Sequence, residues 1–178
     1  NAAKTQAILF PFNKSPKRVQ KSPLTFQGEE IKFTKTASYL GFDLDEKLTF
    51  KRHTTKTAEK GTKCLRSLYP LLSKKSRLSH RNKNIIYKSV IRPVITYGCP
   101  VWHRSASTHI KKLQVIQNKS LKLINKLPWR FSTKLLHQKT RYPVLDTYME
   151  NVAEKFRRNC ALSDFELIRG LVTEQTIS

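Results

Sequence analysis

The sequence predicts an α+β fold that is predominantly α: short antiparallel strands, then a three-helix bundle, then a helical C-terminal extension. Short apolar segments bounded by turn residues occupy the first 45 positions, which is typical of β-strands. After Asp45 the apolar residues recur every three or four positions, as they do on one face of an α-helix. The hydrophobic content of 38% is enough for a packed core in a chain of 178 residues.

The N-terminal segment is predicted to form the edge of a mostly antiparallel sheet. Residues 6–12 are apolar enough for a buried strand. Residues 24–26 and 30–33 flank the dipeptide Gln27–Gly28, and this pattern predicts a hairpin. Residues 39–44 are predicted to form a further apolar strand.

The first predicted helix covers residues 50–73. When its residues are placed about 100° apart, an apolar or small stripe lies opposite a basic ridge. The stripe consists of Phe50, Thr54, Thr57, Gly61, Cys64, Leu65, Leu68 and Leu72, and the ridge of Arg52, Lys56, Lys60, Lys63 and Arg66.

The second predicted helix covers residues 80–97 and is apolar nearly all round, which indicates a buried, central helix. Ser79 is its expected N-cap and Gly98 its expected C-cap, while Pro93 is expected to kink or restart it. Its basic row consists of Arg81, Lys88 and Arg92.

The third predicted helix covers residues 108–127 and ends before Pro128. Two more helices are predicted near 132–139 and 144–162, and the stretch 163–178 is expected to be weak and to fray. The third helix has an apolar side of Ile110, Leu113, Ile116, Leu121, Ile124 and Leu127, and a basic side of Lys111, Lys112, Lys119, Lys122 and Lys126.

Charge gives the first indication of function. The formal net charge is +23, and the span 60–145 contains 20 Lys or Arg among its 86 positions while all 12 acidic residues lie outside it. A single ridge would be interpreted as a solvated face, but a long like-charge surface repels itself unless a polyanion neutralises it. We therefore predict that the three basic rows bind nucleic-acid phosphates. An acidic membrane surface is the weaker alternative.

The sequence contains no evident active site. Asp43 and Asp45 are two residues apart on a predicted strand, so they share a face. Such a pair could bind a divalent ion, but capping of the turn into the first helix is the favoured interpretation. The five histidines are dispersed and are interpreted as surface or packing residues.

Cysteines and aromatic residues are also given structural interpretations. Cys64, Cys99 and Cys160 are far apart and are interpreted as ordinary thiols in a reducing compartment. Tyr97, Trp102 and Trp129 could stack on bases, but flanking Pro and Gly favour core and corner positions. The sequence has no run of 18 apolar residues, so we expect no membrane span.

Several motifs in order resemble the reverse transcriptases of non-LTR retrotransposons, in the jockey-like, LINE-type group. The stretch Tyr39-Leu-Gly-Phe-Asp-Leu-Asp45, with Leu48-Thr-Phe50 and His53, is similar to the segment that follows the polymerase active site. The resemblance covers about residues 1–160. Before this stretch it includes Asn1-Ala-Ala-Lys-Thr5 with Ile8-Leu-Phe10. After it, the matching motifs are Leu78-Ser79, Lys88-Ser89, Pro93 with Thr96-Tyr-Gly98 and Trp102, and Ile116-Gln117 with Leu121 and Pro128-Trp129.

This resemblance implies a fragment of an RNA-directed DNA polymerase. Residues 1–48 would be the palm edge with a primer-gripping hairpin, residues 49–127 the helical thumb and residues 128–178 a helical extension. The family's metal-binding Asp residues would lie upstream of Asn1, so the fragment alone would be inactive and bind no cofactor, although the parent polymerase would use Mg²⁺. Lys4 matches a palm position that polymerases use near the leaving pyrophosphate.

The implied partners are the duplex of RNA template and DNA primer and the rest of the palm and fingers, in the cytoplasm and nucleus. One departure from the group weakens the resemblance of the extension, because no acidic residue follows His137 in His137-Gln-Lys-Thr140. A non-enzymatic, free-standing RNA- or DNA-binding module is the alternative interpretation of the whole chain.

Overall fold

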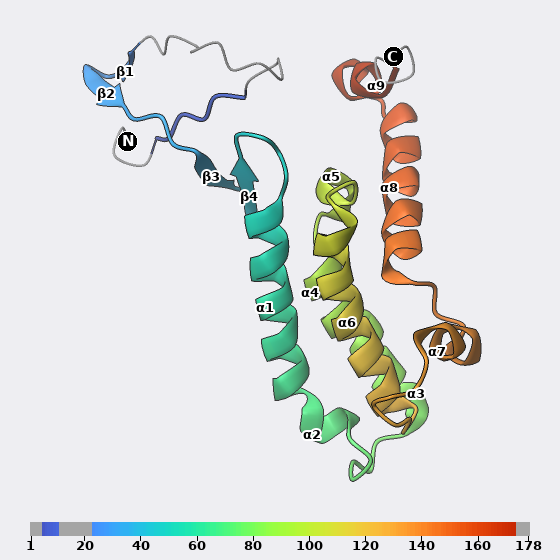
Figure 1. The fold of residues 1–178 in the computed structure, drawn as a ribbon. Helices are drawn as coiled ribbons and strands as arrows, with labels where there is room; N and C mark the ends of the chain where they lie inside the picture. The colour runs from blue at the N-terminus through green and yellow to red at the C-terminus, as the bar shows by residue number, and fades with distance from the viewer. Residues whose placement is uncertain (1–4, 11–22, 174–178) are drawn as a thin grey trace. The chain divides into compact units, whose positions relative to one another are not determined.

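The computed structural model describes residues 5–10 and 23–173 and divides the chain into two units, residues 1–53 and 54–178. The described regular structure of the first unit is mainly short antiparallel strands, and that of the second is helical (Figure 1). The predicted α+β, predominantly α class is therefore confirmed. No helix among the described residues is long and apolar enough to cross a membrane.

The first unit contains the hairpin that the sequence predicts. Strand β1 (Leu24–Phe26) pairs antiparallel with β2 (Glu29–Ile31), with Leu24 opposite Ile31. The intervening Gln27 and Gly28 have φ angles of 53° and 82°, the left-handed values that a tight two-residue hairpin turn requires at both positions.

A second hairpin replaces the single strand predicted at 39–44. Strand β3 (Thr36–Tyr39) pairs antiparallel with β4 (Phe42–Asp45), and the turn between them is Leu40–Gly41, with φ angles of 48° and 83°. The prediction was wrong because apolar composition hides the turn: Leu40 is a poor left-handed residue, and Gly41 alone marks the reversal.

The buried strand predicted at 6–12 is wrong for the described residues 5–10. Only Ala7 forms a bridge there, a parallel one with Phe33, and Phe10 is 43% exposed. An apolar segment becomes a strand only if a partner runs along it, and each described hairpin pairs its two strands with each other. Residues 11 and 12 lie outside the described part.

The helix predicted at 50–73 is two helices, α1 (Lys51–Ser67) and α2 (Tyr69–Leu72). Pro70 lies in the first turn of α2, where its missing N–H costs nothing, but it cannot continue α1. The predicted apolar stripe is confirmed, because its buried members are Phe50, Thr54, Thr57, Gly61, Leu65 and Leu72.

The helix predicted at 80–97 has a π-helical turn in its middle. Its parts are α3 (His80–Ile86), the π segment η2 (Tyr87–Ile91) and α4 (Arg92–Thr96). The N–H of Arg92 donates to the carbonyl of Tyr87, five residues back, immediately before Pro93. The kink expected at Pro93 therefore takes the form of a widened turn.

The predicted caps at the two ends of this helix are confirmed, but the prediction that the helix is buried on nearly all sides is not. Ser79 Oγ accepts from the N–H of Asn82 at 3.2 Å, and Gly98 follows the last turn with a left-handed φ of 58°. The prediction of a helix buried all round is wrong, because Ile85 is 51% exposed and Val90 is also exposed.

Helix α6 (Ser107–Ile124) lies in the middle of the helical unit and contacts α2, α3, α7 and α8 (Figure 1). A short helix that the sequence analysis did not predict, α5 (Cys99–Trp102), precedes it. The fully buried side chains of this unit include Leu72, Tyr87, Ile91, Ile95, Trp102, Leu113, Leu121, Ile124, Leu136, Leu145 and Met149.

Polar side chains of α6 anchor the C-terminal helices α7 (Thr133–Thr140) and α8 (Leu145–Ala161). Gln114 Oε1 accepts from the N–H of Leu145 at 2.6 Å, satisfying one of the free donors at the start of α8. Gln117 Nε2 donates to the carbonyl of Pro143 at 2.7 Å. His137 Nδ1 lies 2.9 Å from the carbonyl of Tyr142, where it donates, so this histidine is a packing residue.

The stretch 163–178 was expected to fray, but part of it forms the last described helix, α9 (Glu166–Thr173). Residues 174–178 lie outside the described part. Helix α9 contacts α8, which gives it a packing partner that sequence propensity does not show.

Gly61 allows a close approach of α1 to neighbouring helices in the described core. A Cβ atom built at this position would lie 2.4 Å from Ile95 Cγ2 and 3.1 Å from Ile116 Cδ1. Real Cβ atoms do not approach other carbons this closely, so α1 packs against α4 and α6 at a distance that only glycine permits.

Gly61→Ala should therefore destabilise the helical unit by about 1–3 kcal/mol in urea unfolding. A loss of stability would be informative, because replacing glycine with alanine ordinarily stabilises an exposed helix interior. Gly170→Ala in α9 is the matched control: its Cβ would meet nothing within 4 Å, so stability should stay the same or rise slightly. In an Ile95→Ala background, which removes the clashing methyl group, Gly61→Ala should cost less. Equal costs for Gly61→Ala and Gly170→Ala would contradict the close approach.

Candidate nucleic-acid interface

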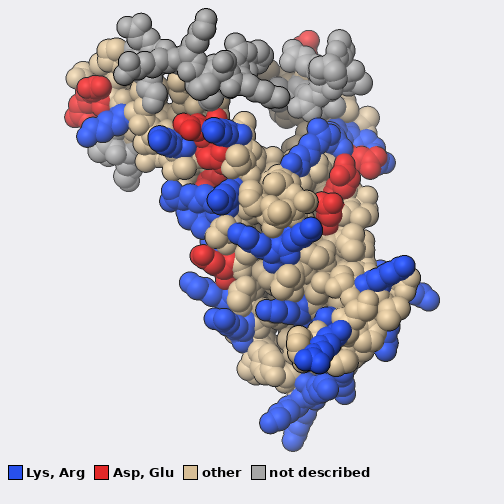
Figure 2. Space-filling view, in the orientation of Figure 1, with Lys and Arg blue, Asp and Glu red and all other residues tan. Residues whose placement is uncertain are grey.

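The helical unit carries a surface of nearly one charge sign. On the face shown in Figure 2, its lower part, where α2, α3 and α7 lie, displays Lys and Arg but no Asp or Glu. The sequence explains this pattern, because residues 60–145 include no acidic residue. Described acids of this unit lie before that span, at Glu59, or after it, beginning with Asp146.

The predicted ridge on α1 is present on the surface of the helical unit. Lys60, Lys63 and Arg66 are exposed, and Lys56 is half-buried. These side chains project from the face opposite the buried stripe, as the helical period predicts. Their spacing of three or four residues places like charges next to one another, which destabilises the helix unless an anion is near.

The predicted basic row on α6 lies beside α1. Lys112 Nζ is 3.4 Å from Thr55 Oγ1, early in both helices. Further along, Lys119 and Arg66 line the same cleft, so the two helices run side by side in the same direction. The row also includes Lys111, which is exposed, and Lys122, which is half-buried. Lys126 is exposed but lies beyond α6, because the helix ends at Ile124 rather than at the predicted residue 127, and Lys126 has a left-handed φ of 54°.

A second basic cluster forms where α3 meets the segment after α7. Arg81 and Lys88, which the sequence predicted, line a cleft of about 630 Å³ together with Lys139 and Arg141, which it did not predict. Arg141 has a left-handed φ of 57° immediately after α7, and this turn brings the chain back toward α3. This cluster could not be predicted from the sequence, because about fifty residues separate its two halves.

Arg92, the third predicted residue of the second basic row, is held in packing contacts. Its guanidinium carbon lies 4.4 Å from the ring centroid of Tyr148 and 6.0 Å from that of Tyr87. Burial raises the pKa of the Tyr87 phenol, so that phenol stays neutral and offers Arg92 only its ring. Arg92 is thus placed to join two helices, with less of it exposed than Arg81 or Lys88.

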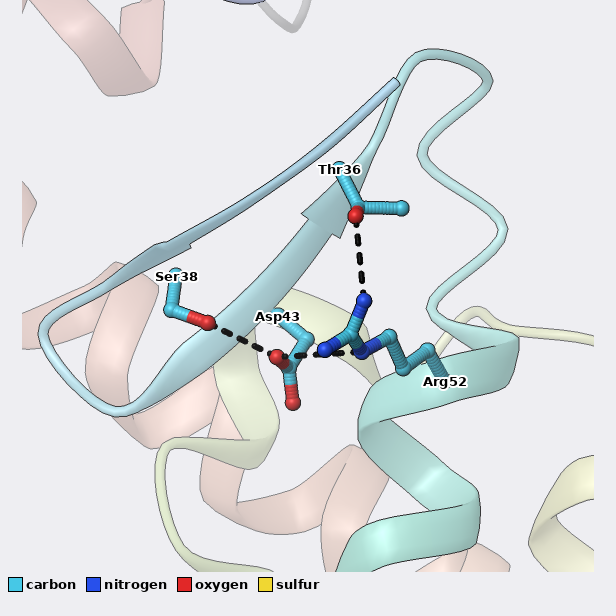
Figure 3. A network of polar contacts seen from close by, with 4 residues as sticks. All are labelled: Thr36, Ser38, Asp43 and Arg52. Atoms are coloured by element: carbon cyan, nitrogen blue, oxygen red, sulfur yellow. Dashed lines mark hydrogen bonds and ion pairs between the residues drawn. The ribbon is translucent and has the colours of Figure 1, made fainter. Parts of the chain in front are cut away.

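Arg52 lies in a polar network within the first unit (Figure 3). Its Nε is 3.6 Å from Asp43 Oδ1, and its Nη1 donates to Thr36 Oγ1 at 3.1 Å. Ser38 Oγ donates to the same Asp43 oxygen at 2.8 Å. A cation shared with a nearly buried carboxylate is less free to bind phosphate, so Arg52 differs from the other ridge residues.

Asp45 organises the turn into α1, as the capping interpretation expected. Its carboxylate accepts from the N–H groups of Lys47, Thr49 and Phe50 at 2.9–3.2 Å, and from Thr49 Oγ1 at 3.0 Å. This turn includes two non-glycine residues with left-handed φ angles, Leu48 and Phe50. The carboxylate compensates for their strain by satisfying the turn's donors.

The two aspartates do not fit a metal site. Asp43 is paired with Arg52, and the carboxylate of Asp45 already accepts hydrogen bonds from the turn before α1. Among the described residues no group of three or more His, Cys, Asp or Glu side chains is placed to hold a metal ion. No step of catalysis is therefore assigned to these carboxylates. Lys4, the palm lysine implied by the resemblance, lies outside the described residues.

The three aromatic residues have different environments. Trp102 is fully buried and its Nε1 donates to the carbonyl of Tyr97 at 2.9 Å, so its core interpretation is confirmed. Tyr97, which is 60% exposed, and Trp129, which is 78% exposed, lie at turns outside the core, so only the corner part of the interpretation holds for them. Local sequence does not decide this, because burial depends on which distant helix covers each ring.

Lys83 is a basic residue with a structural role that the sequence analysis missed. It is buried, and its Nζ donates to the carbonyl of Ser73, at the end of α2, at 2.7 Å. A signal was present: Lys83 shares a four-residue spacing with Tyr87, Ile91 and Ile95, all buried. It therefore lies on the buried stripe rather than on the basic row.

Comparison with known proteins identifies the family. Over 155 residues the chain is 29% identical to the RNA-directed DNA polymerase from mobile element jockey of Drosophila melanogaster. Over 138 residues it is 34% identical to the probable RNA-directed DNA polymerase from transposon X-element of the same species. The chain belongs to the jockey-like, non-LTR retrotransposon RNA-directed DNA polymerases.

This family membership agrees with the resemblance seen in the motifs. The matches cover 87% and 78% of this chain but only 17% and 15% of the jockey and X-element polymerases. The jockey polymerase of Drosophila funebris gives a similar result, with 32% identity over 83% of the chain and 16% of the relative. The chain thus corresponds to a fragment of such a polymerase. No family model and no solved structure matches it.

The carboxyl of Asp45 should titrate below its ordinary value of 3.8. Partial burial raises its pKa, but hydrogen bonds from the backbone and hydroxyl of Thr49 and from the N–H groups of Phe50 and Lys47 outweigh burial and lower the pKa. The stability that Asp45 contributes is therefore present above pH 3.8 and is lost as the pH falls through the lowered pKa.

Carboxyl-carbon NMR titration of the full chain measures this midpoint. Thr49→Ala removes the hydroxyl donor and should move the midpoint upward, whereas Thr25→Ala in β1 should leave it unchanged. A midpoint at or above 3.8 in the unsubstituted chain would show that burial outweighs the hydrogen bonds.

Proposed function

We propose that this chain is the part of a jockey-like reverse transcriptase that binds and positions the template–primer duplex. The observation that carries the proposal is the acid-free span 60–145 of the helical unit, in a chain homologous to RNA-directed DNA polymerases. A duplex of RNA and DNA presents two rows of phosphates, and closely spaced basic residues bind them by releasing condensed counterions.

The arrangement of the basic rows supports backbone binding without sequence readout. The α1 ridge and the α6 row lie on neighbouring helices that run in the same direction, so they offer an extended series of cations. The cluster of Arg81, Lys88, Lys139 and Arg141 adds a second point of contact. Lys and Arg contacts to phosphates fix position and orientation but carry no base information.

The division of labour within the fragment is part of the proposal. Residues 1–48 would form the palm edge with a primer-gripping hairpin, residues 49–127 the thumb, and residues 128–178 the extension. Two observations support this order: hairpins give way to helices after Asp45, and the extension supplies Lys139 and Arg141 to the basic cluster.

Catalysis would belong to parts of the parent polymerase beyond this chain. Mg²⁺-dependent phosphoryl transfer needs paired carboxylates, and Asp43 and Asp45 are committed to Arg52 and to the turn before α1. The residues of this chain would hold the duplex in register with catalytic aspartates in the palm. The remaining palm and fingers are its proposed partners within one polymerase, in the cytoplasm and nucleus.

The proposal predicts steeply salt-dependent binding to an RNA–DNA duplex. If about 6–10 phosphates are contacted, affinity should fall about 10³–10⁵-fold between about 50 and 200 mM salt. Replacing Lys60 and Lys63 with Gln should weaken binding equally for unrelated duplex sequences and reduce the salt slope by about one for each lysine. Fluorescence anisotropy with a labelled duplex measures both quantities.

The matched control replaces Lys155 and Arg158 with Gln. Both residues are exposed on α8 beside Glu150 and Glu154, outside the acid-free span, and this pair changes the net charge by the same amount. Its effect on duplex affinity should be smaller. Equal losses from the two double variants would mean that only net charge matters, and a flat salt response would overturn phosphate binding altogether.

Residues 1–178 alone should show no primer extension with template, primer, deoxynucleotides and Mg²⁺. The reason is that no free pair of carboxylates is found among the described residues. Asp43 is paired with Arg52, and Asp45 accepts hydrogen bonds from the turn before α1. Incorporation of radiolabelled nucleotide above that of a boiled sample would contradict the proposal, provided that a known polymerase extends the same primer in parallel.

A further inference from the structure

We propose that an apolar cleft beside the basic rows binds an unpaired base of single-stranded nucleic acid. The cleft has a volume of about 730 Å³ and lies between the C-terminal part of α1, α2 and α6, with residues 127–129 closing one side. Its size falls within the range of small-molecule sites in proteins. Figure 1 shows that α1 and α6 run beside each other with α2 at the lower end of α1.

The walls of the cleft are apolar and include two exposed aromatic rings. Trp129 is 78% exposed, and Tyr69 is also largely exposed. The other apolar residues of the wall are Leu65, Val115, Leu123 and Leu127. Large apolar surfaces left open to water are typical of binding sites, and Trp and Tyr provide flat faces on which a base can stack.

The charges around the cleft indicate what kind of apolar group enters. Arg66, Lys119 and Lys122 line it, and no acidic side chain of the described residues does. A neutral apolar ligand would gain nothing from these cations, whereas a nucleotide combines a flat apolar base with a negative phosphate. Stacking rings beside cations are the usual means of binding single strands.

Two basic side chains hold Trp129 in place before any ligand arrives. Lys122 Nζ donates to the carbonyl of Trp129 at 2.7 Å, which fixes the backbone of the loop against α6. The guanidinium carbon of Arg130 lies 4.7 Å from the ring centroid of Trp129, and Arg130 does not line the cleft. A ring that is already oriented loses less conformational entropy when a base stacks on it.

The cleft should accept bases without strong sequence preference. Among the described residues that line it, Asn118 is the one neutral amide, and that amide is already engaged: Oδ1 accepts from Gln114 Nε2 at 2.7 Å, and Nδ2 donates to Thr133 Oγ1 at 3.3 Å. Few polar groups are thus left to read base edges. Stacking tolerates every base, because each has an aromatic face.

This inference rests on the proposed nucleic-acid binding for its phosphate contacts, but its base contact is separate. Trp129 and Tyr69 do not belong to the α1 ridge, and Lys60 and Lys63 do not line the cleft. Single-stranded binding and duplex binding can therefore be removed independently.

The test is titration of the full chain with single-stranded oligonucleotides of about 8 nucleotides, followed by tryptophan fluorescence. The chain has two tryptophans, and Trp102 is fully buried, so quenching by a stacked base should come from Trp129. Trp129→Ala should abolish the quenching and weaken single-strand binding by about 5- to 150-fold. Trp129→Phe should retain part of the affinity, and Tyr69→Ala should lose part of it.

Duplex affinity separates the two proposals. Trp129→Ala should leave blunt-duplex binding within about twofold, whereas the Lys60 and Lys63 double variant should weaken it. Because Trp129 is exposed, Trp129→Ala should melt at the temperature of the unsubstituted chain. Duplex binding without Trp129-dependent single-strand binding would overturn the cleft proposal alone, and no binding of either nucleic acid would overturn both. Quenching by an acidic amphipathic peptide but not by oligonucleotides would assign the cleft to a protein partner and also overturn it.

Discussion

Close packing of apolar helix faces around Gly61 holds together a unit whose surface repels itself. A Cβ atom at Gly61 would lie 2.4 Å from Ile95, so the glycine lets α1 approach α4 and α6 closely enough to bury their stripes. Without acidic residues between Lys60 and Leu145, no carboxylate of that span offsets the basic rows. Burial of apolar surface must therefore supply the stability. The same packing places the basic ridge of α1 beside the basic row of α6.

The basic residues of the helical unit divide into two groups by what their charged ends contact. Lys83, Arg92 and Lys122 have contacts within the protein: a helix-end carbonyl, two aromatic rings and the carbonyl of Trp129, respectively. Lys60, Lys63 and Arg66 of α1, Arg81 of α3 and Lys119 of α6 are exposed on the surface. The first group supports the surface, with Lys122 also adding its charge to the apolar cleft, and the second group supplies the rest of the exposed charge. A description by net charge alone would miss this difference.

Two clefts among the described residues of the helical unit have opposite character and suggest complementary uses. The cleft between α3 and the segment after α7 gathers Arg81, Lys88, Lys139 and Arg141, which suits phosphates. The cleft closed by Trp129 is apolar with basic edges, which suits a base that has left the duplex. A polymerase that copies a template handles both paired and unpaired nucleic acid, so both uses agree with the family to which the chain belongs.

The sequence by itself determined the fold class, the helix faces and the charge, because helical period and composition are local properties. Thus the stripe through Thr54, Gly61 and Leu65 and the cap at Ser79 could be predicted from spacing. Only the tertiary structure decided the contacts between distant segments. It brought Arg141 to Arg81, buried Trp102 and left Trp129 exposed, and it tied Arg52 to Asp43. Periodicity shows which side of an element is apolar, but not which distant element will cover it.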